Sequence, residues 1–67
     1  MTMQNTYATV ADFQRWEAAA IGMSVPDLMW AAADARSAAD AVESHAPRQA
    51  SRYRDEADVY DSESRNR

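Results

Sequence analysis

The chain has 67 residues, no cysteine and a formal net charge of −4 at pH 7. A chain of this length forms at most one domain, and without cysteine it can hold neither disulfides nor thiolate metal sites. The acidic balance argues against a phosphate-binding surface over the whole molecule, because such surfaces depend on cationic side chains.

The N-terminal third predicts one helix, over residues 10–21. Before it, residues 1–8 ("MTMQNTYA") are uncharged and are expected to form a short strand or to fray. Thr9 is a suitable N-cap, and Asp12 three residues on makes a short-chain version of the capping box. Gly22 is the only glycine and is expected to end the helix in the left-handed conformation. The predicted apolar face consists of Val10, Phe13, Trp16, Ala20 and Ile21.

A second helix is predicted over residues 25–46. Ser24 is its expected N-cap, Pro26 fits the first helical turn, and Asp27 lies at the positive end of the helix dipole. Pro47 should break this helix, because proline disfavours the helical conformation of the residue before it.

One face of the second helix carries an apolar seam at alternating spacings of three and four residues. Fifteen residues of the chain are alanine, and Leu, Ile, Val and Phe together number seven, so a two-helix hairpin buries little apolar surface. Two interpretations stay open: the first helix covers the seam, or a second copy packs on it and forms a homodimer. The seam consists of Val25, Leu28, Ala32, Ala35, Ala39 and Val42, with Ala46 beyond them.

The last segment, residues 47–67, is predicted to be a polyampholyte tail beside a helical interaction domain at residues 1–46. It carries five acids and five arginines. Arg48, Arg52 and Arg54 come before the acids, an order that opposes the helix dipole. A helix with Ala50, Tyr53, Ala57 and Tyr60 on one face should therefore be marginal, and we expect the tail to be disordered or to fold on a partner.

The sequence offers little for catalysis. His45 is the only histidine, and a cap or surface role at the end of the second helix suits it better than a catalytic or ligand role. The chain has no zinc-ligand set and no phosphate-binding glycine loop, so we expect no enzyme, no cofactor and no metal site. No apolar run approaches the ~20 residues of a membrane span, and no basic signal-peptide start is present. We expect a cytoplasmic protein that does not contact membranes.

Residues 13–35 ("FQRWEAAAIGMSVPDLMWAAADA") resemble the two helices of ribbon-helix-helix proteins, which include antitoxins and plasmid mobilisation accessory proteins. The resemblance implies an obligate dimer that binds DNA, with "MQNTYAT" as the strand in the major groove. It also implies that the amides around Ser24 and Val25 clamp a phosphate. The matching positions are Gly22, Ser24, Val25, Asp27 and Leu28.

Two functions follow as hypotheses. The first is an acidic protein-interaction module, for example a phage- or plasmid-encoded inhibitor that binds a basic surface on nucleic-acid-handling machinery. Trp30 lies nearly opposite the seam, where it is either covered by the N-terminal segment or exposed. An exposed Trp30 would be the anchor, since exposed tryptophans are common in interfaces. The alternative is the dimeric DNA-binding regulator or antitoxin that the resemblance implies. The candidate partner-binding residues are Trp30, Asp27, Asp34, Tyr53 and Tyr60.

Overall fold

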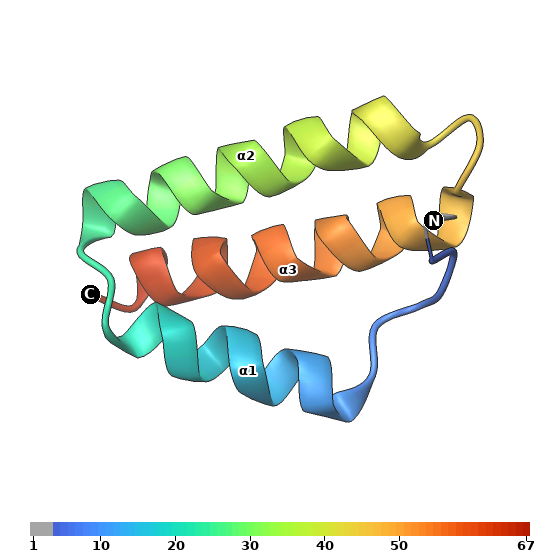
Figure 1. Ribbon diagram of the computed structural model, residues 1–67. Coiled ribbons are helices and arrows are strands. Elements are labelled where there is room, and N and C mark those ends of the chain that lie inside the picture. Colours follow the sequence, from blue (N-terminus) through green and yellow to red (C-terminus); the bar gives the residue numbers. More distant parts are fainter. Residues whose placement is uncertain (1–3) are drawn as a thin grey trace.

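The computed structural model describes residues 4–67 and consists of three helices. These are α1 (Val10–Ile21), α2 (Val25–Val42) and α3 (Pro47–Arg65). Figure 1 shows α3 between the other two, parallel to α1 and antiparallel to α2. Both outer helices pack on α3. The prediction of a mainly α protein is confirmed, with one more helix than the predicted hairpin.

The start of α1 follows the local signals in the sequence. The Thr9 hydroxyl accepts a hydrogen bond from the Asp12 amide at 3.2 Å, and the Asp12 carboxylate accepts one from the Thr9 amide at 3.0 Å. These two bonds complete the predicted capping box. The predicted apolar face is only partly buried: Trp16 and Ala20 lie in the core, whereas Val10 and Ile21 are exposed. Because α1 packs mainly on α3, it buries a narrow stripe.

The end of α1 differs from the prediction. Gly22 has φ −85° and ψ −2°, which is a right-handed conformation, so the predicted left-handed cap is wrong. Its amide donates to the Ala19 carbonyl at 3.2 Å, and the Met23 amide donates to the Ala20 carbonyl at 3.1 Å. These short-range bonds close the last turn without a left-handed residue.

The start of α2 is the predicted one, but its end is not. The Ser24 hydroxyl accepts a hydrogen bond from the Asp27 amide at 3.3 Å, and proline occupies the first turn. The helix ends at Val42 instead of Ala46. Ala46 has φ −143° and ψ 68°, because the helical conformation is unfavourable directly before Pro47. Residues 43–45 form the turn into α3.

Residues 4–8 precede α1 and contain no strand. The predicted strand is therefore wrong over these residues, and residues 1–3 of that prediction lie outside the described part of the chain. The segment instead runs toward the start of α3 (Figure 1), where Asn5 makes its contacts.

The prediction of a marginal or disordered tail is wrong, because residues 47–65 form α3. No side chain near Pro47 caps this helix. The Asn5 side-chain oxygen does so from the N-terminal segment, accepting hydrogen bonds from the Arg48 amide at 2.9 Å and the Gln49 amide at 3.1 Å. A cap of this kind satisfies amides that a helix start leaves without partners.

The C-terminus forms a second long-range cap. The Arg67 guanidinium donates to the carbonyls of Ala20, Ile21 and Met23 at the end of α1. The last turn of α1 contains no basic residue of its own, and a cation stabilises the negative end of a helix dipole. Asn5 and Arg67 therefore each cap a helix that is distant from them in sequence.

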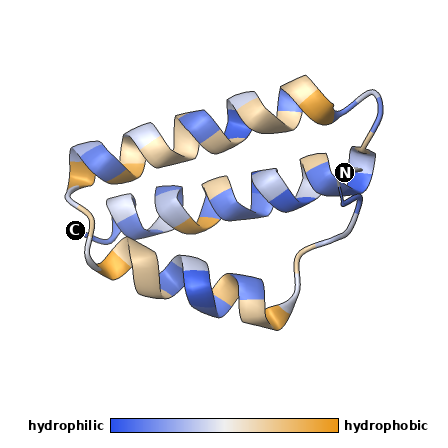
Figure 2. Cartoon of the chain, in the orientation of Figure 1, coloured by the Kyte–Doolittle hydropathy of each residue, from blue (hydrophilic) through white to orange (hydrophobic). Residues whose placement is uncertain are grey.

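The inner face of α2 packs against α3. Its seam residues lie in two buried clusters apart from Val25, which is 37% exposed, and Leu28 is the largest fully buried side chain. Figure 2 shows that hydrophilic residues dominate α3 although it is the central helix, and only one narrow face of it enters the core. α3 covers most of this face, with Trp16 and Ala20 of α1 at one end, an arrangement that neither predicted alternative included, and self-association through the seam stays a prediction. The buried residues are Trp16, Ala20, Leu28, Ala32, Ala35, Ala57 and Tyr60 in the first cluster, and Ala39, Val42, Ala46 and Ala50 in the second.

Candidate functional site

The arginine side chains are directed at groups of the same chain. Within residues 4–67, six arginines form ion pairs with six carboxylates. The seventh, Arg48, lies over the Tyr7 ring with 5.6 Å from its guanidinium carbon to the ring centroid. The chain has no lysine. The net negative charge therefore comes from acids that form no ion pair in this part of the chain, namely Glu17, Asp27, Asp34, Asp55 and Glu56.

Asp12 is the one buried carboxylate among the described residues, and its role is structural. It accepts hydrogen bonds from Arg15 at 2.6 Å and from Arg52 at 2.8 Å, so it links α1 to α3. The hydrogen bond from the Thr9 amide has the largest effect on the pKa of Asp12 and lowers it, whereas burial raises it. Both arginines also lower this pKa, which falls from 3.8 to about 2. A carboxylate held ionised in this way is a poor proton donor.

The predicted partner-binding residue Tyr60 belongs to the core. It is 5% exposed, and its hydroxyl donates to Glu56 at 2.9 Å. Burial, followed by the hydrogen bond to Glu56, raises the pKa of Tyr60 from 10.0 to about 12. Tyr60 therefore contributes mainly to the core, and its part in partner binding stays a prediction.

Trp30 lies opposite the seam, as its spacing predicts, and of the two alternatives for it the structure shows the exposed one. It is 78% exposed, and the neighbouring Met29 is 60% exposed. The two line a shallow apolar depression on the outer side of α2 together with Pro26 and Ala33, and we call these four residues the Trp30 face. The seam occupies the opposite side of the helix, so the fold leaves this face uncovered by the described residues.

Two further predicted residues, Asp27 and Asp34, lie beside the Trp30 face. Asp27 and Asp34 are exposed and stand three residues before and four residues after Trp30, hence on the same side of α2. Asp34 also lines a shallow groove between α2 and α3, together with the half-buried Tyr53 and the edge of Tyr60. The structure thus brings Asp34 and both tyrosines together, whereas Trp30 and Asp27 lie outside that groove.

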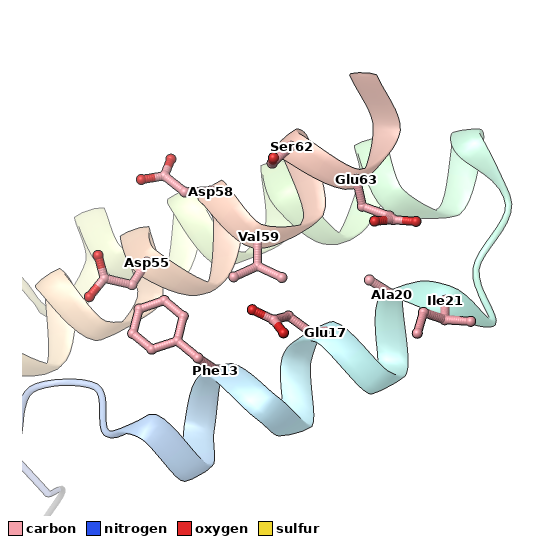
Figure 3. Close-up of a pocket in the computed structure, with 9 residues that line it drawn as sticks. All are labelled: Phe13, Glu17, Ala20, Ile21, Asp55, Asp58, Val59, Ser62 and Glu63. Carbon is pink, nitrogen blue, oxygen red and sulfur yellow. The ribbon is translucent and has the colours of Figure 1, made fainter. Parts of the chain in front are cut away.

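A larger groove separates α1 from α3 (Figure 3), with a volume of about 540 Å³. Phe13, Glu17 and Val59 point into the space between the two helices, as the close-up shows. The sequence did not predict this groove, because its α3 side lies in the segment expected to be a tail. We call it the α1–α3 groove. It is lined by Phe13, Glu17, Ala20, Ile21, Asp55, Asp58, Val59, Ser62 and Glu63.

The predicted phosphate clamp at Ser24 and Val25 lies at the turn between α1 and α2. The Ser24 hydroxyl is occupied by the Asp27 amide, and Val25 is 37% exposed. Arg67 also contacts the Met23 carbonyl beside this turn. The strand that the ribbon-helix-helix resemblance requires is absent from residues 4–9.

His45 lies exposed in the turn after α2. Among the described residues, no group of three or more His, Cys, Asp or Glu side chains is arranged to hold a metal ion. The helices of residues 4–67 include none with the length and apolar character needed to cross a membrane.

No protein-family model, curated protein or solved structure matches the chain. The two surfaces best suited to a ligand are thus identified by exposure, shape and charge alone. One is the apolar Trp30 face on α2. The other is the α1–α3 groove, where apolar and acidic side chains alternate.

Proposed function

We propose that this protein is a non-catalytic module that binds another protein through the Trp30 face. The observation that supports this proposal is the exposure of a tryptophan on a helix whose core-facing side is already covered. Trp30 is 78% exposed, and Met29 beside it is 60% exposed. Interface residues that contribute most to binding are enriched in tryptophan and lie within apolar patches.

The partner that suits this face has an apolar pocket bordered by basic side chains. Asp27 and Asp34 flank Trp30 and form no ion pair within residues 4–67. Carboxylates in this position would speed the encounter with a basic target and fix its orientation. Surfaces that bind nucleic acid are basic, so we propose a regulator or inhibitor that occupies such a surface on another protein.

The test begins with a photo-crosslinking amino acid at position 30, with position 11 as the control site, because Ala11 is exposed on α1. Once the partner is identified, Trp30→Ala should weaken binding at least tenfold, as expected for a central interface residue. Val10→Ala is the matched control, since Val10 is 74% exposed and lies on another helix.

Two results would contradict the proposal. One is a Trp30→Ala variant that binds within twofold of the unaltered protein. The other combines two observations. The protein shifts duplex DNA in a low-salt gel, and Trp30→Ala does not change the affinity for a protein partner. The second result would favour the DNA-binding regulator that the ribbon-helix-helix resemblance implies.

A further inference from the structure

We propose that the α1–α3 groove is a second binding site, which takes a short segment of a different protein with arginine or lysine on either side of an apolar residue. This site shares no residue with the Trp30 face. The inference therefore goes beyond the function proposed above and does not depend on it.

The groove offers an apolar floor. Phe13 from α1 and Val59 from α3 point into it from opposite sides (Figure 3), and both are only partly buried although they pack against the core. Ile21 adds a side chain that is 73% exposed. An apolar side chain laid on this floor would remove the surface of all three from water, which is favourable in proportion to the area covered.

Carboxylates border the floor on both helices. Glu17 comes from α1, and Asp55, Asp58 and Glu63 come from α3. Asp58 and Glu63 already face arginines of this chain, at 3.8 Å and 3.4 Å. Glu17 and Asp55 form no ion pair within residues 4–67, so these two are the groups that cations of a partner would approach.

The charge of the chain identifies the occupant as a different protein. A second copy would have to supply a cation, but the chain has no lysine. Six of its arginines are ion-paired, and Arg48 lies over Tyr7. Withdrawing one of these side chains would cost a contact of the fold itself.

The size of the groove suits a short segment. Its volume of about 540 Å³ lies in the range of small-ligand pockets, roughly 300–1,000 Å³. That space accommodates a few side chains. An extended or turn segment with two cations around one apolar side chain matches the arrangement of Glu17, Asp55 and the floor.

The proposal can be tested by nuclear magnetic resonance titration of the isotope-labelled chain with two synthetic peptides. One has the sequence "GRLRRLRG", and its matched control "GQLQQLQG" replaces each arginine by glutamine. The arginine peptide should shift the resonances of Phe13 and Val59, and its affinity should fall as salt is raised. The glutamine peptide should bind at least fivefold more weakly. This comparison uses the unaltered chain, so it does not depend on the folding of any variant.

Two variants with equal charge changes separate the groove from general attraction to an acidic protein. Glu17→Gln with Asp55→Asn removes the two carboxylates of the groove that have no ion pair. Asp27→Asn with Asp34→Asn removes two such carboxylates near Trp30. We expect the first pair of substitutions to weaken binding of the arginine peptide about fivefold, and the second pair to weaken it less than twofold.

The proposal is overturned if both pairs weaken binding equally, if the two peptides bind equally, or if the shifts map outside the groove. Trp30→Ala should leave this peptide affinity unchanged. A failure of the groove is thereby distinguishable from a failure of the Trp30 face.

Discussion

The long-range cap on α3 makes a prediction that depends on a single side chain. Asn5 accepts hydrogen bonds from the amides of Arg48 and Gln49 at 2.9 and 3.1 Å, and the start of α3 has no other side-chain cap. Replacing a capping residue by alanine costs about 1 kcal/mol, in a range of roughly 0.5–2. For a domain of this size, that cost lowers the Tm by about 4–8 °C. We therefore expect Asn5→Ala to lower the Tm of the chain by this amount.

Two further variants test the cause. Asn5→Asp keeps an acceptor oxygen and adds a negative charge at the positive end of α3, which is worth about 0.3–1 kcal/mol, so it should preserve or raise the Tm. Thr6→Ala alters the neighbouring exposed residue and should stay within about 0.5 kcal/mol of the unaltered chain.

The assay is thermal unfolding followed by circular dichroism, together with amide hydrogen exchange of Arg48 and Gln49. Exchange at these two amides should accelerate in Asn5→Ala before the remainder of α3 is affected. An unchanged Tm in Asn5→Ala would contradict the role of Asn5 as the cap of α3. The same holds if Asn5→Asp destabilises the chain as much as Asn5→Ala.

Three other predictions concern the core and its ionisable groups. Leu28→Ala should cost about 2–5 kcal/mol in urea unfolding, because this side chain is fully buried, whereas the exposed Met29→Ala should change stability by less than about 0.5 kcal/mol. The pKa of Asp12 is lowered from 3.8 to about 2, so its carboxylate should stabilise the fold above about pH 4 and lose this effect as the pH falls toward 2. The difference in unfolding free energy between the unaltered chain and Asp12→Asn should therefore shrink over that range. The pKa of Tyr60 is raised from 10.0 to about 12, so its neutral hydroxyl should stabilise the fold below pH 10 and lose this effect between pH 10 and 12. In an alkaline titration followed by tyrosinate absorbance, Tyr60→Phe should remove the step at the highest pH.

The starts of α1 and α2 could be predicted from the sequence because their signals are local. The Thr9 and Asp12 pair spans three residues, as does the pair formed by Ser24 and Asp27. The position of Trp30 opposite the seam was also predictable, since it follows from helical spacing alone. Its exposure was not, because the N-terminal segment could have covered it.

The existence of α3 could not be predicted in this way because its stabilising contacts are distant in sequence. Asn5 lies 43 residues before Arg48, and Arg67 reaches back 47 residues to Ala20. Taken alone, the arginines at the start of this segment and the acids at its end oppose a helix. In the fold, Arg52 pairs with Asp12, and Arg54 pairs with Asp40 and Glu43.

The missed helix also explains why the surroundings of the seam and Tyr60 were not predicted. Without α3, the seam had to be covered by α1 or by a second copy, and Tyr60 was available to a partner. With α3 in place, Tyr60 and every seam residue except Val25 are buried. The α1–α3 groove exists only because Asp55 and Val59 stand on this helix.

The central claim is that α3 covers the inner face of α2 and leaves Trp30 free on the outside. The most direct measurement is the attenuation of the two tryptophan indole N–H signals by a soluble nitroxide, recorded on the unaltered chain without a partner. Trp30 is 78% exposed and Trp16 6%, so we expect strong loss of the Trp30 signal and little loss at Trp16. Equal protection of both indoles would contradict the claim, because Trp30 would then be covered by this chain or by another copy.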